Sequence, residues 1–306
     1  MKFNNGFIIN PPAFRESHLY LSPFSAKDAY FNRQIWQRKI EDAEPVVELH
    51  QKKMTITESA TLALELVLKH LKLAPDDEVW IVTTSGCAYI SGCVTRTIEK
   101  FCRWSRQKTD RTAAILVNHE FGFLYKDIAA LKAYSLPIIE DKAYSMYSTY
   151  KDRNLNFTGD YEIYSMAKMF PMQAGGLLYA KHTLLPQHNL TAEAASYLKA
   201  CFLHYHSQRE FITHQRMQNY IALGMMFTIL FDFGQGFPID YGDIPGAFIF
   251  CTKGKIDLDN LKIYMQKQGV ESSVFYGEEA FYIPCHQNMN LEHLEYITTL
   301  IKNFMK

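Results

Sequence analysis

Between residues 60 and 181 the chain alternates short apolar runs with segments of helical periodicity, and this alternation constrains the fold most strongly. Continuous apolar runs such as EVWIVTT and TAAILVNH are typical of strands buried on both faces. We predict strands at 78–84, 112–119, 136–141, 160–166 and 175–181, and helices at 60–73, 91–106 and 124–135. This pattern predicts an α/β fold with a mostly parallel central sheet and flanking helices, in which ligands bind beyond the carboxyl ends of the strands.

The pattern changes after about residue 185, so we predict two domains. A long helical region leads to a Gly/Pro-rich junction, FDFGQGFPIDYGDIPG, and the rest of the chain reads strand, helix, strand, helix. Residues 1–185 are expected to form a large ligand-binding α/β domain with an irregular N-terminal segment. Residues 186–306 are expected to form connecting helices and a small α+β domain.

Composition excludes several classes of protein. The 32 basic and 32 acidic residues balance, which disfavours a nucleic-acid binder or a polybasic membrane binder. The six cysteines are scattered without metal-ligand spacing, so we expect no metal and a reduced, cytoplasmic chain. The N-terminus lacks the apolar core of a signal peptide, and no apolar stretch is long enough to span a membrane.

Lys168 lies in the segment YSMAKMFPMQAGGLLYAK, among small and apolar residues and shortly before Gly175 and Gly176. Taken alone, such a lysine is more often a solvated residue at a strand end. If it is buried without a partner, its pKa falls and it is a free amine at neutral pH. A free amine attacks an aldehyde to form a Schiff base, which is the functional interpretation.

Two other segments fit the same chemistry. Asp141 closes an apolar strand, where an ordinary capping aspartate is common, but its carboxylate could also face a cationic ring nitrogen. The segment TESATLAL places hydroxyl groups before a helix, whose first N–H groups favour phosphate, although ordinary N-caps look the same. A helix-start anion site, a strand-end aspartate and then a lysine is the order that pyridoxal 5′-phosphate (PLP) chemistry needs.

From about residue 45 onward, five segments in order resemble the DegT/DnrJ/EryC1/StrS family of PLP-dependent, fold-type-I sugar aminotransferases. The segments are ESATLALELVLKHLKLAPDDEVWIV, ILVNHEFGFLYKDIAALKAYSLPIIED, GDYEIYSMAKMFPMQAGGLLYAK, HQRMQNYIALG and EEAFYIPCHQNMNLEHLEYITTLI. They are similar to the family's Ser-Gly-Thr-Ala helix and "GDEV" strand, its His-x-x-Gly stretch and aspartate strand, its lysine and Gly-Gly segment, its Asn-Tyr-Arg-Met helix and its closing strand and helix. The resemblance implies a divergent, short member with the PLP fold type I.

The resemblance also implies roles for the residues that bind the cofactor. Lys168 would be the Schiff-base lysine, and Asp141 would pair with the pyridine nitrogen. Ala60 and Thr61 would hold the phosphate, with Ser59 beside them.

Other positions would serve the substrate or a neighbouring subunit. Family members are typically homodimers with shared active sites, so His214 and Arg216 would contribute to the neighbouring site, His214 at the cofactor and Arg216 at acidic substrate groups. His119, in the His-x-x-Gly-like stretch, would contact substrate.

The chain departs from the family at three positions around the cofactor. Tyr144 stands where the family has Gln, as in enzymes similar to aspartate aminotransferase, where the phenol donates to the ring oxygen of the cofactor. Ser165, three residues before Lys168, resembles a phosphate-contacting serine of that broader group. The aromatic residue that stacks on the cofactor is replaced by Gly86 or Cys87, which leaves Tyr89 as the nearest ring.

The expected activity is transfer of an amino group from an amino acid, with glutamate as donor, to a keto sugar linked to a nucleotide. Dehydratase relatives lack the Schiff-base lysine, and this chain keeps Lys168. Two alternatives remain: a catalytically idle homologue that acts as a binding or regulatory subunit, and a PLP enzyme for a non-sugar small molecule. Residues 246–306 contain no arginine to clamp an α-carboxylate, which disfavours the latter.

Overall fold

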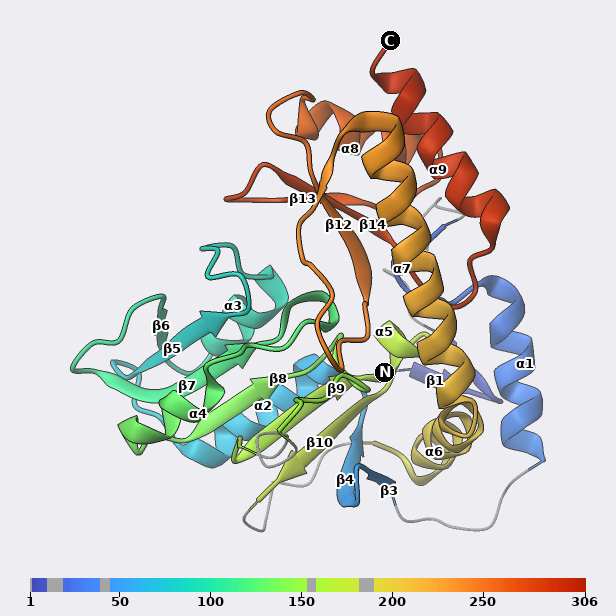
Figure 1. Ribbon diagram of the computed structural model, residues 1–306. Helices are drawn as coiled ribbons and strands as arrows, with labels where there is room; N and C mark the ends of the chain where they lie inside the picture. Colours follow the sequence, from blue (N-terminus) through green and yellow to red (C-terminus); the bar gives the residue numbers. More distant parts are fainter. Residues whose placement is uncertain (1, 10–18, 39–44, 153–157, 182–189) are drawn as a thin grey trace.

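The computed structural model describes residues 2–9, 19–38, 45–152, 158–181 and 190–306, and its largest element is an eight-stranded sheet (Figure 1). In spatial order the strands are β3 (Val46–Leu49), β4 (Lys52–Thr57), β10 (Gly176–Ala180), β9 (Tyr161–Ser165), β8 (Ile138–Asp141), β7 (Thr112–Asn118), β5 (Glu78–Thr83) and β6 (Arg103–Ser105). Strands β5 to β9 pair in parallel, whereas β10 and β3 run in the opposite direction. The predicted mostly parallel sheet is confirmed.

Helix α2 (Ala60–Leu71) follows β4 and covers one face of the sheet with Leu64, Val67 and Leu68. The predicted helix over 91–106 is wrong in its second half. Helix α3 (Gly92–Ile98) ends after two turns, and the chain then forms β6, because pairing with β5 outweighs the local helical periodicity. The helix predicted over 124–135 shortens to α4 (Ile128–Leu131) and a following 3-10 turn, Lys132–Tyr134.

The N-terminal segment is more regular than predicted. It forms a hairpin of β1 (Lys2–Asn4) and β2 (Phe7–Ile9), followed by α1 (Ala26–Gln37), which packs on α6 (Ala192–His206). The buried face of α1 includes Asn32, whose amide donates to the Pro171 carbonyl at 2.8 Å and accepts from the Tyr205 hydroxyl at 2.5 Å. A helix that buries a polar residue lacks the apolar stripe that sequence periodicity detects.

The C-terminal part has its own sheet and core. Helix α7 (Arg209–Phe231) leads to an antiparallel sheet in the order β11 (Gly234–Gln235), β12 (Ala247–Cys251), β14 (Ala280–Pro284) and β13 (Ser273–Phe275), and α8 (Leu258–Lys267) and α9 (Leu291–Phe304) pack on it. The long helix, β12, α8, β14 and α9 match the prediction, whereas the short strands β11 and β13 were not predicted. The predicted domain boundary at 185/186 falls in 182–189, outside the described residues, so the division stays a prediction.

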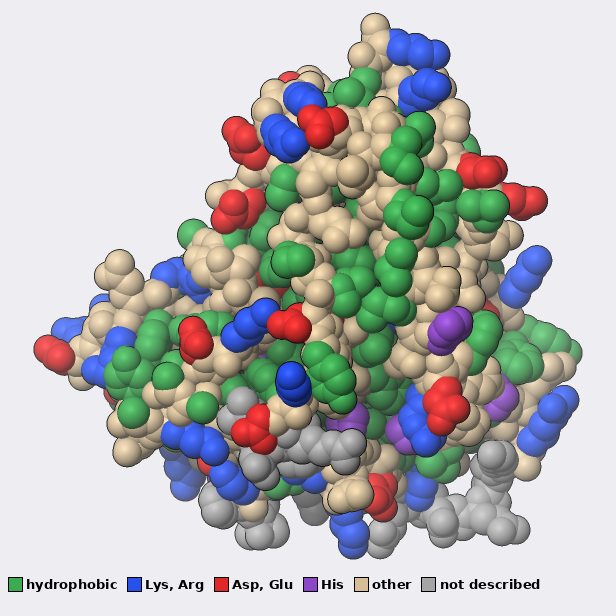
Figure 2. Space-filling view, in the orientation of Figure 1, with side chains coloured by type: hydrophobic (Ala, Val, Ile, Leu, Met, Phe, Trp, Pro, Cys, Tyr) green, Lys and Arg blue, Asp and Glu red, His purple; other side chains and the backbone are tan. Residues whose placement is uncertain are grey.

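A row of exposed apolar side chains follows α7 on the face seen in Figure 2. Its members include Ile221, Met225 and Ile229, which is 77% exposed. Among the described residues, no helix is both long and apolar enough to cross a membrane.

Candidate active site

Several residues predicted to bind a cofactor, among them Ser59, Asp141 and Ser165, lie at one end of the large sheet, because strands end there. β4 ends at Thr57, β8 at Asp141 and β9 at Ser165. Gly176 of the antiparallel strand β10 pairs with both Thr57 and Ser165, so it places the start of α2 beside the turn that carries Lys168. Loops beyond the carboxyl ends of parallel strands are where such folds bind ligands.

The start of α2 has the geometry of an anion site. The Ser59 hydroxyl accepts a hydrogen bond from Leu62 N at 3.1 Å and caps the helix. The first N–H groups of a helix lack intrahelical partners and lie at its positive end, which favours phosphate. A Cβ at Gly176 would lie 2.6 Å from Ala60 N, so only glycine lets this helix start approach the sheet so closely.

Asp141 is a buried carboxylate for which the described residues supply no cationic partner. It is 7% exposed, and its Oδ1 accepts from Ala143 N at 3.0 Å. Burial raises the pKa of Asp141 to about 6, and no positive charge of the described residues lowers it. A buried, ionised carboxylate is stabilised by a cation that enters the site, and a protonated pyridine nitrogen is such a cation.

Lys168 lies on α5 (Met166–Met169), a single helical turn directly after β9. The side chain is partly buried, and its Nζ lies 4.7 Å from the centroid of the Tyr144 ring. Burial acts to lower the pKa of Lys168, but the Tyr144 phenol outweighs burial and holds the pKa above its usual value. The expected lowering of this pKa is therefore wrong for the protein without cofactor, although the proximity of Lys168 and Tyr144 agrees with their assigned roles.

Arg216 does not have the geometry of a substrate clamp. It is 0% exposed, and its guanidinium donates to acceptors inside the protein, among them the Lys168 carbonyl at 2.9 Å and Gln287 Oε1 at 2.9 Å. We therefore correct the predicted role of Arg216 in binding substrate. His214, two residues earlier on α7, is exposed, and its place at a neighbouring subunit's site stays a prediction.

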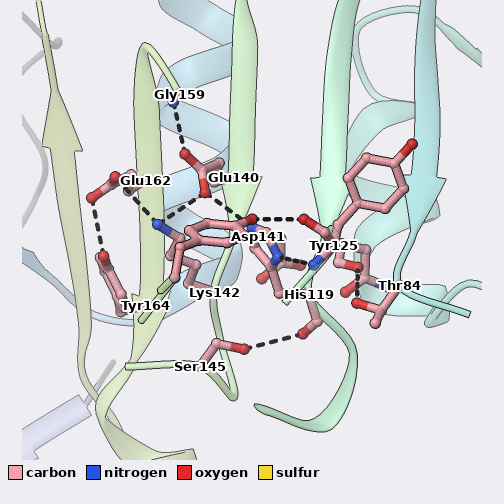
Figure 3. A network of polar contacts seen from close by, with 12 residues as sticks. Thr84, His119, Tyr125, Glu140, Asp141, Lys142, Ser145, Gly159, Glu162 and Tyr164 are labelled. Atoms are coloured by element: carbon pink, nitrogen blue, oxygen red, sulfur yellow. Dashed lines mark hydrogen bonds and ion pairs between the residues drawn. The ribbon is translucent and has the colours of Figure 1, made fainter. Parts of the chain in front are cut away.

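His119 directly follows β7, and its N–H donates to the Asp141 carbonyl at 3.0 Å, but its side chain belongs to a buried ionic network (Figure 3). Its Nδ1 accepts from Tyr125 N at 3.0 Å, so Nε2 carries the proton and donates to Glu140 Oε2 at 3.0 Å. Burial lowers the pKa of His119, so the ring is neutral. Since both ring nitrogens are engaged and the residue is 1% exposed, the predicted substrate contact of His119 is not supported.

The loop after β5 is covered by the β13–β14 turn. Cys87 Sγ donates to the Tyr276 carbonyl at 3.1 Å, and a Cβ at Gly277 would lie 2.9 Å from that sulfur. The Tyr89 ring packs against Phe275 and Tyr276 at centroid distances of 6.2 and 5.8 Å. Tyr89 thus lies in an aromatic cluster, and its stacking on a cofactor stays a prediction.

Two aromatic residues near Tyr144 were missed by the sequence interpretation. The Phe121 ring lies 5.7 Å from Tyr144 and 4.9 Å from Tyr282 of β14. Phe121 has a left-handed backbone with φ of 52°, which costs a non-glycine residue on the order of 1 kcal/mol. The unusual segment EFGF could have drawn attention to Phe121, but nothing in the local sequence distinguishes Tyr282 from a core strand residue.

The described part of the chain contains no group of three or more His, Cys, Asp or Glu side chains arranged to hold a metal ion. The donor set instead fits PLP. Asp141 offers an unpaired carboxylate for a ring cation, Lys168 an amine, Tyr144 a phenol, and the start of α2 with Ser165 nearby an anion site.

Comparison with known proteins agrees with this chemistry. The model of the DegT/DnrJ/EryC1/StrS aminotransferase family matches residues 105–225, which include Asp141, Lys168 and Arg216. No curated protein sequence matches the chain. The family match confirms the predicted resemblance, the class of enzyme and PLP as cofactor.

Solved structures share the fold across most of the chain. Spr1654 of Streptococcus pneumoniae, provisionally described as a sugar aminotransferase, is 17% identical with a TM-score of 0.71 over 93% of this chain and 96% of that one. The aminotransferase TlmJ of Streptoalloteichus hindustanus is 15% identical, with a TM-score of 0.65 over 92% and 91%. The GDP-4-keto-6-deoxy-D-mannose-3-dehydratase of E. coli is 12% identical, with a TM-score of 0.63 over 81% and 87%. The predicted fold type I is confirmed.

Proposed function

From the premise that this chain is a PLP-dependent enzyme of the DegT/DnrJ/EryC1/StrS aminotransferase type, we propose that it transfers an amino group from an amino acid, glutamate first, to a nucleotide-linked keto sugar. The observation that carries the proposal is the contact of Lys168 with Tyr144 beside the unpaired carboxylate of Asp141.

The described residues divide the chemistry of transamination among them. When bound, PLP supplies an aldehyde for the lysine and a ring that accepts electrons from the substrate carbon. Asp141 would hold a proton on the ring nitrogen, and the start of α2 would bind the phosphate, with Ser165 as a further donor. Lys168 would move a proton at the substrate carbon, and Tyr144 would orient the lysine nitrogen.

The arginines favour a sugar over an α-keto acid as acceptor. An α-carboxylate is commonly held by a bidentate arginine. Residues 246–306 contain no arginine, and the guanidinium of Arg216 is used inside the protein. The keto sugar named for the E. coli dehydratase of the same fold, which is linked to GDP, supports the nucleotide-linked class.

The proposal is tested by the two half-reactions measured separately. PLP-loaded protein is mixed with glutamate, aspartate or alanine, and formation of pyridoxamine phosphate is followed by chromatography. The aminated protein is then offered a nucleotide-linked keto sugar or pyruvate, with recovery of PLP as the readout.

We expect glutamate to react fastest and the keto sugar to restore PLP. Restoration by pyruvate alone would contradict the sugar assignment, and no reaction with any donor would leave a catalytically idle homologue. A homodimer with shared active sites stays a prediction, which the molecular mass in solution checks.

A further inference from the structure

The guanidinium of Arg216 links the turn that carries Lys168 to the C-terminal part of the chain. Arg216 Nη2 donates to the carbonyls of Lys168 at 2.9 Å and Met169 at 3.2 Å. Arg216 Nε donates to Gln287 Oε1 at 2.9 Å, and Gln287 Nε2 donates to the Met169 carbonyl at 2.9 Å. The last carbonyls of α5 are thus bound by donors from α7 and from the loop after β14.

These donors matter because α5 cannot hold its own shape. A single helical turn is far too short to be stable alone, and its terminal carbonyls have no partners within the helix. At its start, Met166 N donates to the Gly175 carbonyl at 2.9 Å, and the Ser22 hydroxyl donates to the Ala167 carbonyl at 2.7 Å, so these bonds hold the first half of the turn. The second half, which carries Lys168, is held by Arg216 and Gln287.

The same arginine also supports Tyr144. Arg216 Nη1 donates to the Pro245 carbonyl at 3.2 Å, directly before Gly246. A Cβ at Gly246 would lie 2.5 Å from Cδ1 of Tyr144, so the phenol ring rests on this stretch of backbone. One buried guanidinium thus fixes the backbone beneath both partners of the contact between Lys168 and Tyr144.

We propose that Arg216, oriented by Gln287, is a positioning residue that sets the distance between the Lys168 nitrogen and the Tyr144 ring and so prepares the lysine to bind PLP. The inference deepens the proposed function and rests on it, because PLP is the aldehyde that the lysine receives. Arg216 acts through the backbone and touches neither cofactor nor substrate. The planar guanidinium can donate to several backbone carbonyls at once, and a lysine ammonium with its single nitrogen cannot replace it.

The test compares Arg216→Lys and Gln287→Met with a matched control. Asn219 lies on the same helix and donates to the carbonyls of His286 and Met289 at 2.9 and 3.2 Å, so Asn219→Ala loosens the same loop without touching α5. Tyr144→Phe gives the effect of losing the phenol directly. The readouts are the dissociation constant for PLP and the pH midpoint of the visible absorption band of lysine-bound PLP.

We expect Arg216→Lys and Gln287→Met to weaken PLP binding about tenfold, the loss that corresponds to one hydrogen bond to a fixed group. Their absorption midpoints should shift in the same direction as that of Tyr144→Phe. Asn219→Ala should lower the melting temperature but keep the wild-type PLP affinity and midpoint.

The proposal would be overturned if Arg216→Lys and Gln287→Met both kept the wild-type PLP affinity and absorption midpoint. It would also be overturned if Asn219→Ala showed the same shifts as these two variants. If Arg216→Lys does not fold, Gln287→Met decides, because it removes the orienting amide and leaves the guanidinium in place. Absence of the band in the wild type would instead contradict the proposed function itself, since Arg216 is then intact.

Discussion

Glu140 and Asp141 are neighbours on β8, yet their surroundings differ sharply. Glu140 is 0% exposed, accepts from Gly159 N at 2.7 Å and pairs with Lys142 at 2.9 Å and with His119 at 3.0 Å. Asp141, on the opposite face of the strand, accepts one backbone hydrogen bond and faces no cation of the described residues. Burial acts to raise the pKa of both, but Lys142 and His119 reverse its effect at Glu140 and lower that pKa.

This difference distinguishes charged residues that stabilise the fold from a charged residue that is available to bind a ligand. The network of Glu140, Lys142, Glu162 and His119, which Tyr164 completes by donating to Glu162 at 3.0 Å, is satisfied within the protein. Asp141 is left with the cost of burial and no ion partner, which is the state expected of a residue that awaits a charged ligand. A buried charged side chain therefore does not by itself indicate the cofactor site. A buried carboxylate that lacks an ion partner among the described residues does indicate it.

The largest expected effect comes from breaking the satisfied network. Lys142→Met removes the cation that bridges two carboxylates that are 0% exposed. Among the described residues, Glu140 then keeps only His119, and Glu162 keeps only Lys52 at 3.6 Å, as an ion partner, so the loss should cost about 3–5 kcal/mol in the free energy of unfolding. Urea unfolding measures the loss. The control is Lys181→Met, which breaks an exposed pair with Asp160 at 3.6 Å and should cost below about 1 kcal/mol. Equal, small losses in both variants would contradict the comparison.

Asp141→Asn should stabilise the protein without cofactor, whereas Lys142→Met should destabilise it. The folded-state pKa of about 6 lies above the ordinary aspartate pKa of 3.8, so ionisation of Asp141 destabilises the fold. The wild type should lose up to about 3 kcal/mol of stability as pH rises from about 4 to above 6, and the asparagine variant should not.

The same variant should bind PLP roughly 10–100-fold more weakly, because a charge-assisted hydrogen bond to the ring is lost. Unfolding at several pH values and PLP titration provide the two readings. A stabilised variant that still binds PLP like the wild type would assign Asp141 to structure alone.

A smaller effect is expected at Gly176, where the start of α2 approaches the sheet. Gly176→Ala would place a Cβ against the backbone of Ser59 and Ala60, which should cost about 1–3 kcal/mol and weaken PLP binding by displacing the start of α2. At Gly234, a Cβ would meet nothing within 4 Å, so Gly234→Ala is the matched control. If both alanine variants bind PLP equally well, the close approach of α2 does not matter for the cofactor.

Much of the sheet and of the candidate site could be predicted from the sequence, because both depend on short local patterns of residues. Apolar runs identified β5, β7, β8, β9 and β10. The chemistry of Asp141, Lys168 and the start of α2 depends on residues that lie next to a strand end. The structure adds what depends on distant partners. Arg216 contacts residues 29, 48 and 71 positions away, and no local pattern distinguishes such a buried arginine from an exposed one.

Helix α1 and strand β6 were missed in the sequence analysis for a different reason. α1 buries Asn32 in place of an apolar stripe, and β6 follows a helical segment with no turn signal between them. In both cases tertiary contacts with α6 and β5 override the local pattern, and a single sequence carries no record of those contacts.

The central claim is that Lys168, and not the more deeply buried Lys142, is the lysine that binds PLP. The most direct measurement is reduction of the PLP-loaded protein with borohydride, followed by peptide mass mapping of the wild type and of Lys168→Ala. We predict one phosphopyridoxyl group on the peptide that contains Lys168, and none in the variant. Label on another lysine, or no label in the wild type at saturating PLP, would contradict the assignment of this edge of the sheet as the active site.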